Sequence, residues 1–184
     1  AIENVVTTDN GFFDESMHLG LMRFGHDPDP NADGTVITVA GQTDPSGIID
    51  GQALDVGWYD QDNDPTGYFN CNGESIVDFL TNVEPPLCVG LNCAGIGTWT
   101  QGALLAARDY IGQTRIDHPE DLTVDDERSY FVMLMTDGVW TTQVGQAPVS
   151  AAEEAAFDPV PVGGDLFTTD DVPVYVVAFG DAIG

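Results

Sequence analysis

Three stretches of this chain are rich in apolar residues and show little of the polar alternation of a half-exposed strand. They span residues 18–25, 131–136 and 172–180. Apolar runs without alternation are typical of strands that are buried on both faces of a parallel sheet. The pattern therefore predicts an α/β domain with a doubly wound, mostly parallel sheet, in which these three strands run parallel.

Helical spacing of apolar residues is found elsewhere in the chain. The clearest case is residues 101–111, with Thr100 as the predicted N-cap and Gly112 as the predicted C-terminal stop. Shorter helices are predicted over residues 74–80 and 151–157 by the same spacing and by helix propensity.

The apolar run that begins at residue 131 ends at Asp137, which is followed by Gly138. In open α/β sheets, ligands bind at the carboxyl ends of the strands, so this position predicts a site at Asp137. The alternative is that Asp137 only opens a turn, because Asp-Gly is a common turn dipeptide.

Hydroxyl residues gather just before the predicted long helix, in the sequence Gly-Thr-Trp-Thr at 97–100. This motif, followed by an apolar strand that ends in Thr-Asp-Gly at 136–138, resembles the von Willebrand factor type A domain. In that family, the first Thr of Thr-x-Thr and the Asp of the strand-end Asp-Gly belong to a metal-ion-dependent adhesion site. The resemblance implies that Thr98 and Asp137 bind Mg²⁺ or Mn²⁺, and that an acidic group of a protein or cell-surface partner completes the coordination.

The resemblance is incomplete on the other side of the metal site. In the family, a central first strand ends in Asp-x-Ser-x-Ser and supplies most of the direct ligands, and this motif is absent from the 184 residues. Two explanations remain, an internal fragment whose first strand lies upstream or a degenerate site. We expect the fragment, truncated at both ends, because the chain also stops before the family's closing helix.

Within the family, several motifs are most similar to the adhesin domain of type IV pilus tip proteins. They are the strand at 20–25, a long cysteine-containing insert, and the segments 93–100 and 135–141. The resemblance implies an extracellular, non-enzymatic binding domain at a cell surface or pilus tip. The alternatives are a structural subunit of an extracellular filament or surface layer and, more remotely, a glycoside hydrolase. The sequence has no phosphate-binding Gly-x-x-x-x-Gly-Lys, no nucleophile elbow and no Lys.

Charge narrows the class of partner. The chain has 4 basic residues, all Arg, against 31 acidic residues, for a formal net charge of -27 at pH 7. This charge excludes nucleic acid and anionic membranes as natural partners. It suits a saline or halophilic setting, since the screening length shrinks to about 3 Å at about 1 M salt. No stretch approaches the roughly 20 apolar residues of a membrane span.

Residues 27–95 form a long insert in the single domain that we expect over residues 1–184. We expect the insert to lie beside the metal-binding edge and to act as a specificity surface. It begins with oxygen-bearing side chains at alternate positions, as in the first half of a calcium loop. The candidate ligands are Asp27, Asp29, Asn31 and Asp33, and a weaker candidate group is Asp60, Asp62 and Asp64. Ala40 stands where a calcium loop has Glu, and both stretches are also typical of Asp-rich turns that hold no ion.

All three cysteines lie in this insert, at Cys71, Cys88 and Cys93. The histidines are scattered, which argues against a zinc site and favours an oxidising, extracellular setting. A disulfide between Cys88 and Cys93 and one between Cys71 and Cys88 differ by only about 1 kcal/mol in loop entropy, so both pairings remain open. The odd cysteine indicates a partner outside this chain.

Overall fold

A computed structural model describes residues 17–24, 53–60, 63–69, 72–82, 98–123, 128–136, 139–142 and 146–179. Several residues that the sequence singles out lie outside these ranges, so what is predicted for them stays a prediction. They are Asp137 of the adhesion site, Asp27, Asp29, Asn31, Asp33 and Asp62 of the calcium candidates, and Cys71, Cys88 and Cys93.

Two strands, β5 (Val132–Thr136) and β6 (Val174–Ala178), pair in parallel. Val132 lies opposite Val174, and the register continues without a bulge to the end of both strands. The two runs are therefore parallel neighbours, as their apolar patterns predict. Because parallel neighbours cannot be joined by a tight turn, the chain between them must cross over the sheet.

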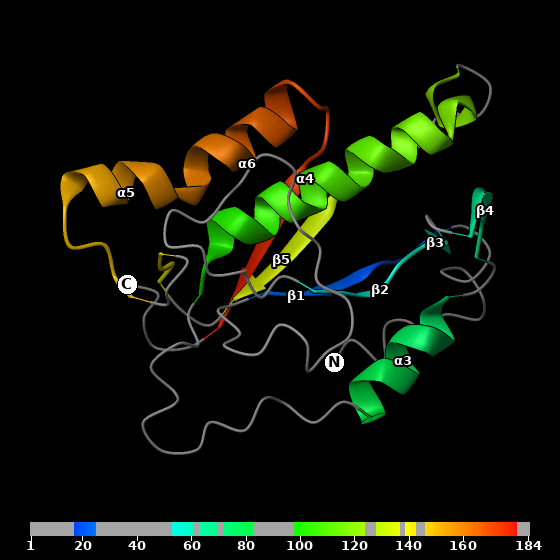
Figure 1. Cartoon of the computed structure of the whole chain (residues 1–184), viewed down its shortest axis with the longest axis horizontal. Coiled ribbons are helices and arrows are strands. Elements are labelled where there is room, and N and C mark those ends of the chain that lie inside the picture. The colour runs from blue at the N-terminus through cyan, green and yellow to red at the C-terminus, as the bar shows by residue number, and fades with distance from the viewer. Residues whose placement is uncertain are drawn as a thin grey trace.

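Two helices, α4 (Thr100–Asp117) and α6 (Pro159–Thr168), cover one face of this strand pair. A shorter helix, α5 (Ala151–Phe157), precedes α6. α4 and α6 lie side by side on the same side of β5 and β6, and α5 leads into α6 (Figure 1). α5 and α6 together make the crossover between the two strands.

The apolar core lies between α4, α6 and the covered face of the strand pair. Leu104 and Ile111 of α4 pack with Leu166 of α6, and each is at most 4% exposed. Val132 and Val174 close this cluster from the strand side. Burial of each large apolar side chain stabilises the fold by about 1.5–3 kcal/mol, so this cluster holds the helices on the sheet.

The long predicted helix is present, but both predicted ends are wrong. Thr100 is the first helical residue and Trp99 precedes it without a side-chain cap, so Thr100 is not the N-cap. The helix also continues through Gly112 to Asp117. Gly112 is a weak stop signal, and the residues beyond it, including the fully buried Thr114, gain contacts that outweigh the roughly 1 kcal/mol cost of a helical glycine.

No pattern in the sequence predicts α6, because its ten residues include two prolines and two glycines. Its start is set by Asp158, whose carboxylate accepts a hydrogen bond from the amide of Val160 at 2.9 Å. Pro159 occupies the first turn, where its missing N–H would have no helical partner. Burial of Leu166, which is 0% exposed, offsets the glycines that lower helix propensity here.

The N-terminal strand does not join β5 and β6. β1 (Leu21–Arg23) pairs antiparallel with β2 (Ala53–Val56), in a sheet separate from the parallel pair. Within the described ranges, the three-strand parallel sheet is therefore not formed, and the doubly wound fold stays a prediction. The physical reason is that an apolar run reports the burial of a strand and not the direction of its neighbour.

The described part of the insert forms a short hairpin and a helix. They are β3 (Tyr59–Asp60), paired antiparallel with β4 (Asp64–Tyr68), and α3 (Gly73–Asn82). The helices predicted over 74–80 and 151–157 are thus confirmed as α3 and α5, whereas β4 was not expected from a segment with Asp, Pro and Gly. Buried Asn72 ties this region to β1, since its amide group bonds with the backbone N–H and carbonyl of Leu19.

The outer face of β5 and β6 differs from the prediction of strands buried on both sides. Phe131, Met133 and Tyr175 are 42%, 57% and 57% exposed. They alternate with the covered residues along their strands, so they belong to the opposite face. The apolar runs thus reflect one face that is packed and one that is open in this structure.

Candidate functional site

The start of α4 lies against the segment that follows β5. The backbone amide of Thr141 donates a hydrogen bond to the carbonyl of Thr98 at 2.9 Å. Thr100, Thr136 and Trp140 line one groove, so the entrance of the helix is at the carboxyl end of β5. Trp140 is half-buried there, so its side chain packs against the protein and stays partly accessible to a ligand. This is the edge at which open α/β sheets bind ligands.

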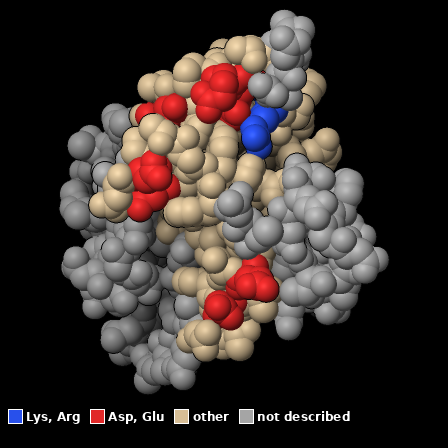
Figure 2. Space-filling model, turned by 90° about the vertical axis from the view of Figure 1, so that its right-hand side faces the viewer, with Lys and Arg blue, Asp and Glu red and all other residues tan. Residues whose placement is uncertain are grey.

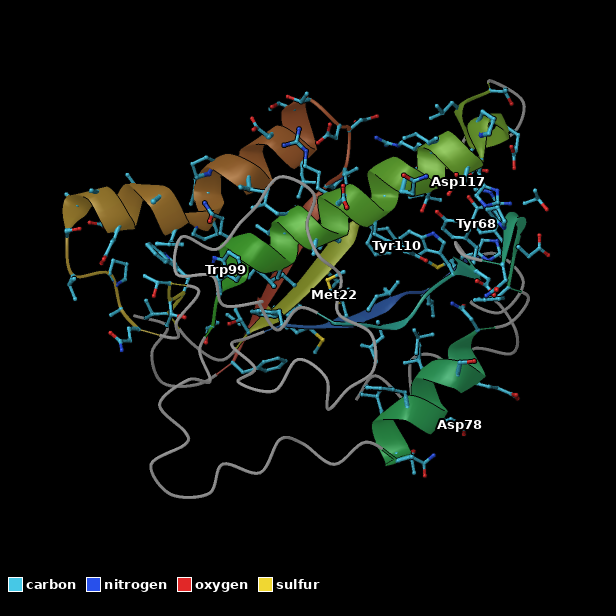
Figure 3. All side chains as sticks on the ribbon, viewed as in Figure 1. Met22, Tyr68, Asp78, Trp99, Tyr110 and Asp117 are labelled. Atoms are coloured by element: carbon cyan, nitrogen blue, oxygen red, sulfur yellow. The ribbon has the colours of Figure 1, made fainter. Side chains whose placement is uncertain are left out.

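The two hydroxyls of the Thr-x-Thr motif differ in accessibility. Thr98 is half-buried, whereas Thr100 is 6% exposed and donates its hydroxyl to the carbonyl of Thr98 at 3.3 Å. Trp99 between them is 3% exposed and lies at the beginning of α4 (Figure 3). Of this pair, Thr98 is therefore the residue that a ligand from solvent reaches more easily.

Two buried polar atoms flank the hydrogen bond between Thr98 and Thr141. The indole N–H of Trp99 and the hydroxyl of Thr142 have no hydrogen-bond partner in the part of the chain that the structure describes. Buried polar groups are nearly always hydrogen-bonded, so we expect these two atoms to bond to water, to a ligand or to residues outside the described ranges.

The chemistry of these residues suits a hard divalent cation. Mg²⁺ prefers oxygen ligands, and Thr98 offers a hydroxyl while Asp137, which follows Thr136 in the chain, offers a carboxylate. Among the described residues, no group of three or more His, Cys, Asp or Glu side chains is placed to hold an ion. An ion at this edge therefore needs Asp137 and other ligands from outside the described ranges.

The weaker calcium candidate is partly described. Asn63 donates from its backbone amide at 3.0 Å and from its side chain at 3.1 Å to the carboxylate of Asp60. The carboxylate of Asp64 accepts the hydroxyl of Thr66 at 2.8 Å. These bonds are those of an Asp-rich turn, and since Asp62 is not described, both the turn and the calcium interpretation remain.

A second cluster of polar and aromatic side chains lies at the far end of α4. We call His18, Tyr59, Tyr68, Tyr110 and His118 the aromatic cluster. The ring of Tyr68 stacks on His18 at 4.4 Å and on His118 at 4.1 Å between centroids. Tyr59 contacts His118 edge-on at 5.0 Å and lies 5.8 Å from Tyr110. These contacts bring together residues from four separate parts of the sequence.

A buried carboxylate anchors this cluster. Asp121, in the 3-10 helix η2 (Pro119–Leu122), is 1% exposed. It accepts hydrogen bonds from the hydroxyls of Tyr68 and Tyr130, the latter at 2.6 Å, and its other oxygen lies 3.0 Å from Nε of Arg128. A buried charge is tolerated when it is paired and hydrogen-bonded, and Asp121 meets both conditions.

Hydrogen bonds join the hairpin region to the C-terminal half of α4. The indole N–H of Trp58 donates to Thr114 at 3.0 Å, and the hydroxyl of Tyr59 donates to Asp117 at 2.8 Å. Figure 3 shows Tyr68, Tyr110 and Asp117 converging between β3–β4 and this end of the helix. The β3–β4 hairpin is thus fixed at the end of α4 opposite Thr98. The prediction that the insert lies beside the metal-binding edge is therefore wrong for this hairpin.

The environment of the cluster shifts several pKa values. Burial lowers the pKa of His18, and the nearby Arg128 cation lowers it further. Burial and the hydrogen bond to Asp121 raise the pKa of Tyr68, and they raise the pKa of Tyr130 to about 12. His118 is 1% exposed, with Nδ1 at 3.0 Å from Glu120 and Nε2 without a hydrogen-bond partner among the described residues.

No pattern in the sequence predicts the aromatic cluster. Its members are single His and Tyr residues without regular spacing, and the segment around His118 resembles an acidic connector. The one usable signal was the concentration of Tyr and Trp at residues 58–68, which favours burial against another element.

Within the described ranges, no helix is long and apolar enough to cross a membrane. Comparison with known proteins adds no relative: no family model, no curated protein and no solved structure matches this chain. The similarity to the von Willebrand factor type A domain therefore rests on the motifs around Thr98 and Asp137.

Proposed function

We propose that this chain is a non-enzymatic binding domain that uses a divalent metal ion at the carboxyl edge of β5. The observation that carries the proposal is the hydrogen bond from Thr141 to Thr98 at 2.9 Å. It holds the accessible threonine of the Thr-x-Thr motif against the segment that leads away from Asp137. These are the two residues that the resemblance assigns to a metal-ion-dependent adhesion site.

In this proposal, the hydroxyl of Thr98 is a direct ligand and the carboxylate of Asp137 is a direct or water-bridged ligand. The bound ion supplies an open coordination position for an acidic group of the partner, and Mg²⁺ and Mn²⁺ suit the hard oxygen ligands. Such a site binds and does not catalyse. The remaining ligands come from a segment equivalent to Asp-x-Ser-x-Ser, which the 184 residues do not contain.

We place the domain outside the cell, at a cell surface or at the tip of a type IV pilus. The placement is supported by the motifs at 93–100 and 135–141 and by the three cysteines of the insert. The net charge of -27 argues against a nucleic acid as the partner.

One observation favours the alternative of a filament or surface-layer subunit. The outer face of β5 and β6 exposes Phe131, Met133 and Tyr175, and exposed apolar patches often mark protein contacts. A subunit of this kind would self-associate without a divalent metal. Size-exclusion chromatography with and without EDTA, at high salt to screen the acidic surface, separates the two functions.

The proposed function is tested by titrating Mn²⁺ into the natural protein that contains this sequence, with free Mn²⁺ followed by electron paramagnetic resonance. We expect one site that Thr98→Val weakens and that Asp137→Asn weakens further, because each removes a ligand. Thr168→Val and Asp78→Asn, at exposed positions of α6 and α3, are the matched controls. Unchanged Mn²⁺ binding in both site variants would refute the adhesion site.

A further inference from the structure

A groove of about 600 Å³ runs between α6 and the covered face of the strand pair. Its floor includes Leu104 and Leu134, which are 4% and 8% exposed. Its rim includes Val160, Phe167 and Val176, which are 73%, 61% and 59% exposed. The volume lies within the roughly 300–1,000 Å³ of ordinary ligand pockets, and none of the described residues that line the groove is charged. The groove is therefore suited to an apolar group.

One end of the groove meets the edge described above. Thr100, Thr136 and Trp140 belong to its lining, and Asp137 follows Thr136 in the chain. A partner whose acidic group binds a metal at this edge would have its neighbouring residues over the groove. The groove thus ends beside the residue that precedes Asp137 in the chain.

The charges near the groove determine which residues of the partner can lie next to its metal-binding acidic group. α5, α6 and the residue between them carry acidic side chains and no basic ones: Glu153, Glu154, Asp158 and Asp165. The acidic surface is not confined to these helices: on the side of the molecule at the right of Figure 1, away from α5, acidic side chains form several groups and basic side chains one small group (Figure 2). An acidic partner segment would be repelled here, and a basic one would be attracted.

The arginines with described side chains are already engaged within the chain. Nε of Arg108 lies 2.6 Å from the carboxylate of Asp170, and Arg128 pairs with Asp121. Arg115 donates to the backbone carbonyl of Asp170 at 2.7 Å. These three cations are therefore poorly placed to neutralise an acidic partner at the groove.

We propose that the groove binds one aromatic side chain of a basic polypeptide segment. The inference deepens the proposed function, because it names the chemistry of the partner that the metal edge would also contact. An aromatic side chain brings a large apolar area and fits the apolar floor, while basic neighbours are attracted by the acidic side chains on and between α5 and α6. The groove contributes apolar affinity, and the surrounding charge contributes attraction and selectivity.

Three capped pentapeptides test the proposal by isothermal titration calorimetry in EDTA. They are acetyl-Arg-Arg-Trp-Arg-Arg-amide, the same peptide with Ala in place of Trp, and the same Trp peptide with Glu in place of each Arg. None of the basic peptides carries a carboxylate, so their binding does not use the metal. We expect the basic Trp peptide to bind about tenfold more tightly than the basic Ala peptide, and the acidic Trp peptide not to bind.

Two neighbouring glycines of α6 provide a matched pair of variants. A Cβ atom at Gly163 would lie 3.8 Å from Cδ1 of Leu104, in ordinary contact and directed at the groove floor. A Cβ atom at Gly164 would meet nothing within 4 Å. Gly163→Leu therefore fills the groove, whereas Gly164→Leu makes the same change in helix propensity and leaves the groove open.

We expect Gly163→Leu to lose the preference for Trp over Ala and Gly164→Leu to retain it. Phe167→Ser removes an exposed rim residue, so it should reduce the preference without affecting folding, and it replaces Gly163→Leu if that variant does not fold. At about 1 M salt the basic charges lose most of their effect, but the difference between Trp and Ala should persist.

Several results would overturn the inference. They are equal binding of the Trp and Ala peptides, binding of the acidic Trp peptide, no binding of any peptide, and an unchanged preference in the tested groove variant. The outcome is separable from that of the metal site: Asp137→Asn should keep the peptide preference while it loses Mn²⁺. If the groove does not bind the peptide but the metal site exists, Mn²⁺ binding should remain intact.

Discussion

The ring of Tyr68 stacks on the ring of His118 with centroids 4.1 Å apart, which joins β4 of the insert to the residue directly after α4. Tyr68 also stacks on His18, which precedes β1, with centroids 4.4 Å apart. Three segments distant in sequence are held together at this point. The hairpin is thus anchored to the body of the protein at the end of α4 that lies away from Thr98.

Replacement of Asp121 by alanine should strongly destabilise the protein. The change leaves Arg128 without its buried partner and leaves the hydroxyls of Tyr68 and Tyr130 without their acceptor. Arg128 is 46% exposed and returns to water, so the cost comes mainly from the two tyrosine hydroxyls, at about 1–3 kcal/mol each in the free energy of unfolding. Urea denaturation measures the loss.

Asp78→Ala is the control for this change, because Asp78 is exposed on α3 and its replacement alters the net charge equally. We expect the control to stay within about 0.5 kcal/mol of the wild type. A loss below about 1 kcal/mol for Asp121→Ala would show that the cluster does not depend on its carboxylate.

Protonation of His18 should oppose folding. Burial and Arg128 lower its pKa in the folded state, with Asp121 and His118 also nearby, so the unfolded chain takes up the proton first as pH falls. The contribution of His18 to the free energy of unfolding should therefore decrease as pH falls through about 6.5, and it should level off below the folded-state pKa of His18.

His18→Phe keeps a ring against Tyr68 but cannot be protonated. Its free energy of unfolding should fall less than that of the wild type between about pH 8 and about pH 5, measured by urea denaturation. Parallel curves for the two proteins would mean that His18 titrates equally in the folded and unfolded states. NMR titration of the His18 ring gives the folded-state pKa directly.

Two glycines should respond in opposite ways to alanine. Gly112 lies within α4, and a Cβ atom there would meet nothing within 4 Å, so Gly112→Ala should stabilise by about 0.5–1 kcal/mol. At Gly57, a Cβ atom would lie 2.8 Å from the hydroxyl of Tyr110, so Gly57→Ala should destabilise by about 1–3 kcal/mol. Thermal denaturation compares them, and the same sign for both would contradict these local environments.

The predicted calcium loop gives a further test. If Asp29, Asn31 and Asp33 are ligands, isothermal titration should detect Ca²⁺ binding at millimolar concentration, and their joint replacement by alanine should abolish it. Anomalous scattering should place the ion beside these residues. Absence of binding in both measurements would favour the ion-free turn.

How far the sequence predicts this fold depends on the kind of signal. Apolar runs and helical spacing located β5, β6, α3, α4 and α5, because burial of these side chains decides local structure. Two predictions fail for one reason: the sequence predicts a helix end at Gly112, where α4 continues, and it does not predict α6. In both places packing, of Thr114 and of Leu166, overrides weak local helix propensity.

The Thr98 motif and the aromatic cluster also differ in how far the sequence predicts them. Thr98 is a candidate from sequence because its motif is continuous and precedes a helix, and its role as a ligand stays a prediction. The aromatic cluster was missed because His18, Tyr68 and His118 meet through the tertiary structure, and nothing in their local sequence specifies those contacts. The antiparallel pairing of β1 with β2 is not predicted by the sequence for the same reason, since strand pairing is a long-range property.

The most direct test of the central claim is an anomalous difference map at the Mn edge, from crystals of the natural protein containing this sequence grown with Mn²⁺. We predict one ordered peak at the carboxyl edge of β5, at a coordination distance of about 2.0–2.3 Å from the hydroxyl oxygen of Thr98 and within direct or water-bridged reach of Asp137. Crystals of the Asp137→Ala variant should lack the peak and retain the fold. A peak that persists in that variant, or no peak near Thr98 in the wild type, would contradict the metal-dependent adhesion site.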